Sequence, residues 1–136
     1  MAKASGAVVL VDSSIWIAEF RRPGVLAANT TFPEIAICPP IFQEVLQGIR
    51  FEGLYATARA VLLSVAMLEA PLPTDVFEQA AQLYRTGRAT GFTIRSPFDC
   101  LIAACALRNG MAVLHSDRDF ETIARFTRLQ SRYVAL

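Results

Sequence analysis

The feature that most constrains the fold is a short apolar run, Ala7–Val11, which ends at Asp12. An unbroken aliphatic run of this length is typical of a strand buried on both faces, the usual situation in a parallel sheet. Ser13 or Ser14 then offers a side-chain cap for a helix that runs through Phe20. The segment therefore predicts a strand, a turn and a helix in direct succession.

The alternation of strand and helix continues along the chain. Apolar runs at Ile35–Cys38 and Met111–Leu114 predict two more strands, and Tyr133–Leu136 predicts an edge strand. Strands that alternate with helices predict an α/β fold with a mostly parallel sheet and right-handed crossovers. The helices are expected over Ile41–Arg50, Leu54–Leu68, Thr74–Arg88, Pro97–Arg108 and Phe120–Phe126.

Length and composition predict one domain over residues 1–136, since a chain of 136 residues has the usual size of a single domain. The residues are 54% hydrophobic and 18% charged, which excludes a disordered chain and leaves apolar surface that a partner can cover. The formal net charge is +1, so any contact with nucleic acid must be local. No apolar run approaches the roughly 18 residues of a membrane helix. No membrane partner is therefore expected. Three cysteines without a CxxC pair favour a protein of the reducing cytoplasm.

The single histidine, His115, limits the chemistry that the chain can perform. One imidazole cannot form the acid and base pair of metal-free RNA cleavage, and the Cys and His ligands are too few for a usual structural zinc site. The sequence also contains no Gly-rich dinucleotide motif and no phosphate-binding P-loop. Catalysis would therefore rest mainly on carboxylates.

Four carboxylates fall where a parallel sheet would gather them. Asp12 closes the first strand, and Asp117 follows the strand that begins at Met111. Because the carboxyl ends of parallel strands share one rim, these two acids can lie side by side. Asp99 lies in the first turn of the helix before that strand, and Glu44 lies one turn into the helix after the second strand. All four fit a single acidic cluster.

The acids also have purely structural explanations. Asp99 can complete a capping box with Ser96, and Asp117 or Asp119 can cap the helix that follows. Glu44 can be a solvated helix residue, but its neighbours are apolar and no lysine lies nearby to pair with it. The clustered arrangement explains Glu44 better.

Convergence of these carboxylates would require a cation or raised pKa values. Two carboxylates about 4 Å apart repel by roughly 4 kcal/mol at an effective dielectric constant near 20, against a total stability of about 5 to 15 kcal/mol for a domain. Oxygen ligands alone favour a hard ion, Mg²⁺ or Mn²⁺. Such an ion activates water and neutralises a phosphoryl oxygen, so the expected reaction is hydrolysis of a phosphodiester.

Four segments resemble the motifs of a known family, the PIN-domain ribonucleases, and within it the VapC toxins of bacterial type II toxin–antitoxin systems. The similar segments are Val11–Ile17, Phe42–Gly48, Ser96–Ala104 and Leu114–Phe120. Their order and spacing fit the family, and the resemblance covers nearly the whole chain. It implies a three-layer α/β/α domain around a mostly parallel sheet.

The resemblance also implies an activity, a cofactor and partners. The family cuts single-stranded or loop RNA with Mg²⁺ or Mn²⁺, is commonly a homodimer, and is silenced by an antitoxin whose C-terminal segment wraps the toxin. One departure is His115, where many relatives carry a threonine, with Ser116 as a substitute hydroxyl. The implied catalytic residues are Asp12, Glu44, Asp99 and Asp117, the metal ligands are Asp12, Asp99, Asp117 and Asp119, and the substrate-binding residues are Ser14 and Arg118.

Two other functions remain open from the sequence. One is a phosphatase or phosphotransfer domain with an aspartate nucleophile, but no second acid follows Asp12 two residues on and no lysine follows the last strand. The other is a PIN-like binding module that has lost its metal and its activity. Binding of Mn²⁺ distinguishes this module from the nuclease.

Overall fold

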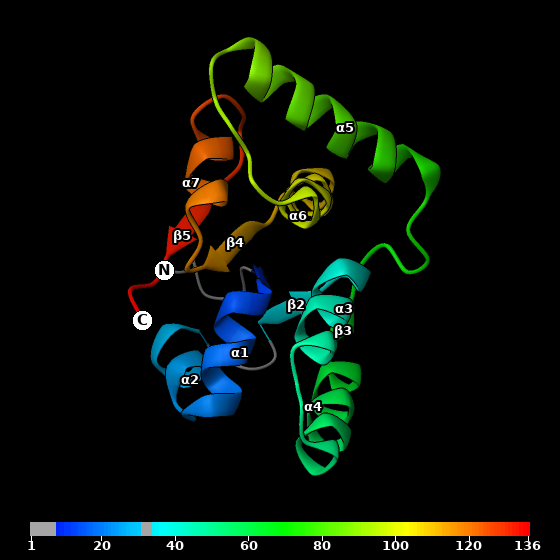
Figure 1. Ribbon diagram of the computed structural model, residues 1–136, viewed down its shortest axis with the longest axis vertical. Coiled ribbons are helices and arrows are strands. Elements are labelled where there is room, and N and C mark those ends of the chain that lie inside the picture. The colour runs from blue at the N-terminus through cyan, green and yellow to red at the C-terminus, as the bar shows by residue number, and fades with distance from the viewer. Residues whose placement is uncertain (1–7, 31–33) are drawn as a thin grey trace.

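The computed structural model describes residues 8–30 and 34–136, which form a five-stranded sheet with helices on both faces (Figure 1). All strand pairings are parallel, in the order β3-β2-β1-β4-β5. The strands are β1 (Val9–Val11), β2 (Ile35–Ile37), β3 (Ala66–Met67), β4 (Ala112–His115) and β5 (Ser131–Tyr133). The helices are α1 (Ser13–Arg21), α2 (Val25–Asn29), α3 (Pro39–Gln47), α4 (Glu52–Ser64), α5 (Thr74–Ala89), α6 (Pro97–Asn109) and α7 (Arg118–Ala124).

The layers follow from the direction of the crossovers. The chain leaves β1 toward β2 and β3 through α1–α4, and then returns past β1 to β4 and β5 through α5–α7. Right-handed crossovers in opposite directions place these two helix groups on opposite faces of the sheet. Figure 1 shows α1–α4 on one side of the strands and α5–α7 on the other. The expected three-layer α/β/α class with a parallel sheet is confirmed.

The order of strands reverses between β1 and β4, and this point of the sheet is where open α/β folds bind ligands. Val11 pairs with Leu114, and the Asp12 N–H donates to the Leu114 carbonyl oxygen over 2.9 Å. The carboxyl ends of the two strands are therefore fixed side by side.

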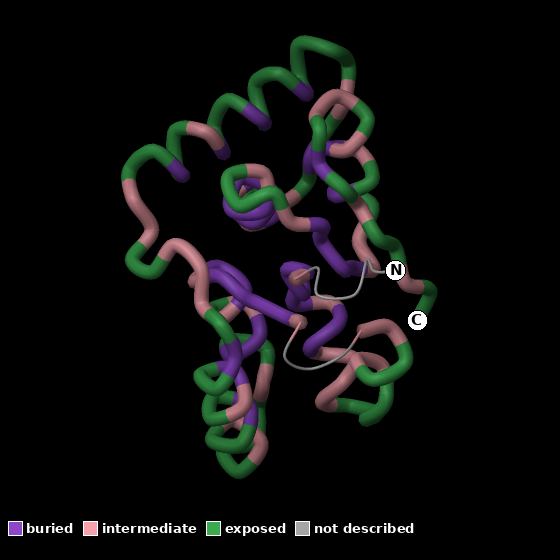
Figure 2. The backbone as a smooth tube through the Cα atoms, turned by 180° about the vertical axis from the view of Figure 1, so that it is seen from behind, coloured by how far each residue is buried: buried purple, intermediate pink, exposed green. Residues whose placement is uncertain are grey.

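Strands β1, β2 and β4 form the centre of the core, and every residue in them is buried. Figure 2 shows this buried centre and the exposed outer surfaces of α4 and α5. Trp16 is buried beneath α1, where its indole N–H donates to the Val11 carbonyl oxygen over 3.1 Å. Burial of each large apolar side chain contributes about 1.5 to 3 kcal/mol to the free energy of folding. The core beneath the carboxyl ends of the strands is therefore stable.

Two elements differ from the sequence-based expectations. The predicted helix over Leu54–Leu68 is too long, because α4 ends at Ser64 and β3 pairs with β2 directly after it. A strand of two residues is too short to show its own period within an apolar run. Helix α2 was not predicted, and it follows Gly24, whose φ of 119° lets the chain turn sharply after α1.

The other boundaries agree within a few residues. The last strand covers Ser131–Tyr133 instead of Tyr133–Leu136, and the last helix starts at Arg118. Residue Ala7 of the first predicted strand lies outside the described residues.

Candidate active site

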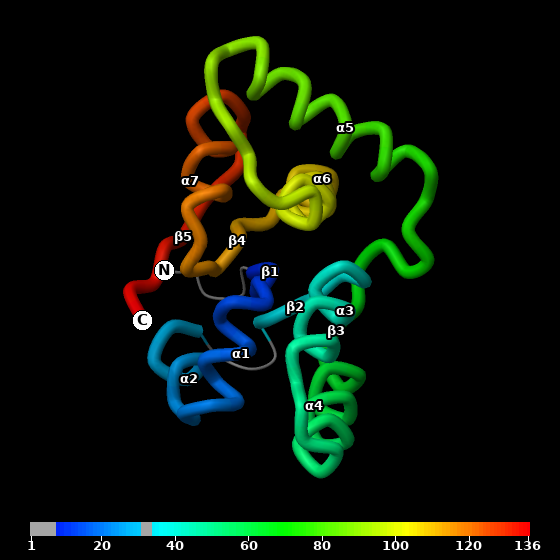
Figure 3. Tube along the Cα trace, in the orientation of Figure 1, coloured from blue at the N-terminus to red at the C-terminus, as the bar shows by residue number. Residues whose placement is uncertain are grey.

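Segments that are distant in the sequence meet at the carboxyl ends of β1 and β4, near the start of α6 (Figure 3). Five acids form two overlapping triplets, and within each triplet one carboxylate oxygen of every residue lies within 4.8 Å of the others. The triplets are Asp12, Glu44 and Asp99, and Asp99, Asp117 and Asp119. The structure thus brings together all five acids that the sequence singled out, with Asp99 shared by both groups.

Asp12 is the first residue after β1 and the N-cap of α1. Its Oδ2 accepts hydrogen bonds from the Ser14 N–H over 3.1 Å and from Ser14 Oγ over 2.6 Å. The prediction that Ser13 or Ser14 caps this helix is therefore wrong, because the aspartate is the cap. Burial raises the pKa of Asp12, although the bonds from Ser14 oppose this shift.

Asp99 lies in the first turn of α6 and is 2% exposed. Burial is the main cause that raises its pKa to about 10, and the neighbouring Asp119, Asp117 and Asp12 raise it further. The capping-box explanation is wrong, because the N–H of Ser96 donates to Asp119. Asp99 is thus a buried acid whose placement helix capping does not explain.

Asp119 holds the start of α6 from the neighbouring helix α7. Its Oδ2 accepts the N–H groups of Arg95 and Ser96 over 3.0 and 2.9 Å, and its Oδ1 accepts the Arg95 N–H over 3.2 Å. The exposed Arg95 guanidinium approaches Oδ1 only to 3.9 Å. Both oxygens of Asp119 therefore have backbone partners before any ligand is present.

Asp117 is half-buried and caps α7, where its Oδ1 accepts the Asp119 N–H over 2.9 Å. The capping role predicted as one possibility for Asp117 is thus present, and its carboxylate still lies within the acidic cluster. Glu44 is half-buried on α3, and its Oε1 accepts a hydrogen bond from Ser13 Oγ over 3.0 Å. Burial chiefly raises the pKa of Glu44, and Asp12 adds to this.

The two other site candidates lie at the edge of the cluster. Ser14 Oγ accepts the Ser116 N–H over 3.0 Å while it donates to Asp12, so this hydroxyl joins the loops that follow β1 and β4. Arg118 follows Asp117 directly and is exposed. Sequence reasoning gave Ser13 only a possible capping role and missed its bond to Glu44, although its position beside Asp12 in the first motif was a signal.

The donor set fits a hard divalent cation. Within the described part of the chain, Asp12 Oδ1 and Asp99 Oδ2 are the buried side-chain oxygens that lack a hydrogen-bond partner. Buried polar atoms are normally paired, and an unpaired one costs about 1 to 3 kcal/mol. A cation bound by these oxygens would satisfy both and would favour the ionised form of the two carboxyl groups.

Comparison with known proteins identifies the family of the chain. The model of the PIN domain family matches residues 9–126. The chain belongs to the PIN domain family. Ribonuclease VapC11 of Mycobacterium tuberculosis is 37% identical to this PIN domain over 131 residues, which cover 91% of this chain and 97% of that protein. The resemblance noted in the sequence is thereby confirmed.

Solved structures share the fold of this PIN domain. The VapBC-5 toxin–antitoxin structure from M. tuberculosis matches with a TM-score of 0.68 at 22% identity, over 94% of this chain and 99% of that one. VapC20 of the same organism, a toxin that cleaves the sarcin–ricin loop, matches with a TM-score of 0.68 at 20% identity, over 90% and 98% of the two chains.

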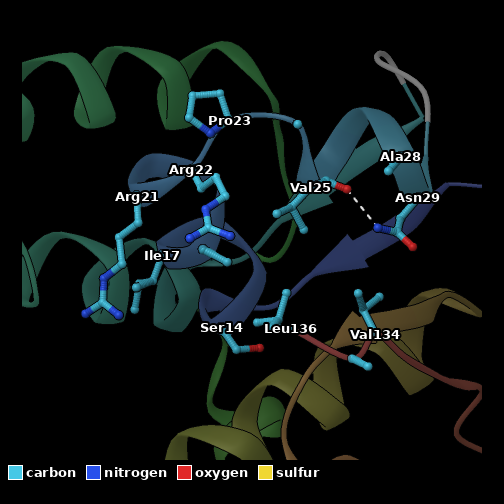
Figure 4. Close-up of a pocket in the computed structure, with 13 residues that line it drawn as sticks. Ser14, Ile17, Arg21, Arg22, Pro23, Val25, Ala28, Asn29, Val134 and Leu136 are labelled. Carbon is cyan, nitrogen blue, oxygen red and sulfur yellow. Dashed lines mark hydrogen bonds between the residues drawn. The ribbon is translucent and has the colours of Figure 1, made fainter.

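An apolar groove of about 740 Å³ lies between α1, α2 and the C-terminal residues of this PIN domain (Figure 4). Ile17, Val25 and Leu136 are among the side chains that line it, and Ser14 connects it to the acidic cluster. None of the helices within the described ranges is long and apolar enough to cross a membrane.

Proposed function

We propose that this PIN domain is a divalent-metal-dependent endoribonuclease of the VapC toxin type. The observation that carries the proposal is the pair of unpartnered buried oxygens, Asp12 Oδ1 and Asp99 Oδ2, inside a cluster of five acids. Open α/β sheets bind ligands at the switch point of the strand order, and buried carboxyl oxygens without a partner at that point suit a hard cation. The 37% identity to ribonuclease VapC11 supports RNA as the substrate.

In the proposed site, Asp12 and Asp99 would hold the ion directly, and Asp117 and Asp119 would complete its surroundings. A bound Mg²⁺ or Mn²⁺ supplies charge neutralisation at the phosphoryl oxygen and activation of water. Asp99 would release its proton to solvent on binding the cation. Glu44, half-buried with a raised pKa, accepts the proton of the attacking water as the new P–O bond forms and the bond to the leaving ribose oxygen breaks.

Substrate contacts in the proposal come from the edge of the cluster. The exposed guanidinium of Arg118 binds a phosphate of the RNA, since Arg is a planar donor that matches phosphate oxygens. Ser14, half-buried beside Asp12, would contact the substrate, and it orients the Asp12 carboxylate.

The proposal extends to partners and setting. The apolar groove would take a segment of a cognate antitoxin, as the match to the VapBC-5 toxin–antitoxin structure supports. Occupation of the groove next to Ser14 would silence the nearby site. We further propose one PIN domain over residues 1–136, acting as a homodimer in the cytoplasm.

The test uses the chain purified without antitoxin. Structured RNA is incubated with the protein in Mg²⁺, in Mn²⁺ or in excess chelator, and Mn²⁺ binding is measured by calorimetry. We expect cleavage with either ion, none with chelator, and none for Asp12→Ala or Asp99→Asn. Asp75→Asn, an exposed acid on α5, is the matched control and should cleave normally.

Each alternative outcome has a meaning. Cleavage by Asp12→Ala and Asp99→Asn at the wild-type rate would show a contaminating nuclease or a misplaced site. A folded wild-type protein that binds no Mn²⁺ would be the silent binding module.

A further inference from the structure

His115 lies at the carboxyl end of β4, two residues before Asp117 of the acidic cluster, and is fully buried. Its ring packs against Phe120 and Tyr133, with centroid distances of 5.0 and 5.9 Å. The role proposed above for the carboxylates leaves this imidazole, the single histidine of the chain, without a function. Its hydrogen bonds indicate one.

The bonds define a single tautomer. Nδ1 of His115 accepts the N–H of Asp117 over 3.0 Å, so this nitrogen carries no proton. Nε2 carries the proton and donates it to Ser131 Oγ, which in turn donates to the Glu121 carboxylate. With the proton on Nδ1 instead, two donors would face each other at Asp117.

This chain of bonds reaches the candidate metal ligands through the backbone. The N–H of Ser116 is bound to Ser14, which holds Asp12, and the next N–H, of Asp117, is bound to His115. Two successive amide groups are therefore fixed by two different side chains. The position of the Asp117 carboxylate relative to Asp12 depends on both.

We propose that His115 is a positioning residue for the acidic site, whose Nδ1 holds the backbone of Asp117 so that its carboxylate faces Asp99. Ser131 and Glu121 keep the ring in the tautomer that leaves Nδ1 free. This role rests on the proposed function, because positioning matters only if the carboxylates bind a cation.

A pair of amide substitutions separates the two ring nitrogens. His115→Asn keeps an acceptor near the place of Nδ1, whereas His115→Gln keeps a polar group near the place of Nε2, and both lose the packing of the ring. We expect His115→Asn to bind Mn²⁺ close to wild type. His115→Gln should bind it about 10- to 100-fold more weakly, the usual effect of removing a partner of a metal ligand.

Ser131→Ala provides a second route that leaves the buried ring in place. Without the Ser131 hydroxyl the Nε2–H group loses its acceptor and only the Asp117 N–H still favours this tautomer, so Mn²⁺ affinity should fall in the single variant. In the His115→Asn background the same change should have no further effect, because the relay is already interrupted. Equal losses in both backgrounds would assign the effect to β5 alone and would overturn the proposal.

The single histidine also gives a direct spectroscopic test. A long-range ¹H–¹⁵N spectrum of the protein without a histidine tag contains one imidazole, and we expect the Nε2–H tautomer. An Nδ1–H tautomer, or equal Mn²⁺ binding by His115→Asn and His115→Gln while the wild type cleaves RNA, would overturn the positioning role and leave the proposed function intact. A wild-type protein that neither binds Mn²⁺ nor cleaves RNA would overturn both.

Discussion

The two sides of the acidic cluster differ in the groups that hold their carboxylates. On the side of α1 and α3, Asp12 and Glu44 accept hydrogen bonds from serine hydroxyls, although Asp12 also accepts one backbone N–H. On the side of α6 and α7, Asp117 and Asp119 accept backbone N–H groups. Between them, Asp99 is buried with an unpartnered oxygen.

The difference distinguishes carboxylates whose oxygens the protein itself satisfies from carboxylates that keep a buried oxygen without a hydrogen-bond partner. Backbone N–H groups at a helix start stabilise a carboxylate, so Asp119 is satisfied by the protein itself. Asp12 and Asp99 retain buried oxygens that the protein does not satisfy. We therefore expect substitution of Asp12 or Asp99 to affect mainly catalysis, and substitution of Asp119 to affect mainly stability.

The largest expected effect follows from replacing Asp12 or Asp99, the two acids whose buried oxygens lack a hydrogen-bond partner. Asp99→Asn or Asp12→Asn should lower the cleavage rate by at least about 100- to 1,000-fold. Each change removes a carboxylate proposed to hold the cation, which would neutralise charge on the phosphoryl oxygen in the transition state. The folded state should keep its melting temperature or gain stability, since the variant no longer carries a buried acid whose pKa is raised by folding. Rate measurements check the loss of activity, and thermal melts check the stability. A large loss of stability would contradict the expectation that these two acids act mainly in catalysis.

The pH dependence of the metal-free protein sharpens the same contrast. The folded-state pKa of Asp99 is raised to about 10, so the folded protein holds a proton that the unfolded chain releases above about pH 3.9. The stability from this proton is complete below about pH 3.9 and is lost as the pH rises toward about 10. We expect the melting temperature without metal to fall from pH 5 to pH 9. Asp12 and Glu44 shift in the same direction.

Asp99→Asn is the control for this effect. Its melting temperature should fall less over the same range, and Mn²⁺ should raise the wild-type melting temperature more at pH 9 than at pH 5. Parallel pH profiles for the two proteins would contradict the assignment of the proton to Asp99.

A smaller and structural effect is expected from Asp119→Ala. The variant leaves the Arg95 and Ser96 N–H groups without their acceptor, and leaving a donor without its hydrogen-bond partner costs about 1 to 3 kcal/mol. Chemical unfolding should show this loss, while Mn²⁺ affinity should fall less than in Asp12→Asn. Abolished Mn²⁺ binding at unchanged stability would instead make Asp119 a direct ligand.

The smallest expected effect is that of Ser13→Ala. It removes one hydrogen bond to Glu44, worth about 0.5 to 1.5 kcal/mol, so cleavage should slow by about 2- to 10-fold. Steady-state kinetics should show the change in kcat, because Glu44 is proposed to handle a proton. Ser64→Ala, an exposed serine at the end of α4, is the matched control and should leave kcat unchanged.

The clustering of the acids was predictable from the sequence because strand ends and motif spacing are local signals. Asp12 and Asp117 follow buried runs, and the parallel sheet brings them to one rim. The partners of the acids were not predictable in the same way. The bond from Ser96 to Asp119 spans 23 residues, so local spacing wrongly paired Ser96 with Asp99. Strand β3 was missed because two residues carry no period of their own.

The register between β1 and β4 constrains how the length of this chain can vary during evolution. Val11 pairs with Leu114, and the acids follow one and three residues later. Inserting or deleting a single residue in either strand would shift one acid by about 3.3 Å and turn alternate side chains to the opposite face of the sheet. Homologous sequences should therefore tolerate gaps around α4 and between β3 and α5, and exclude them within β1 and β4.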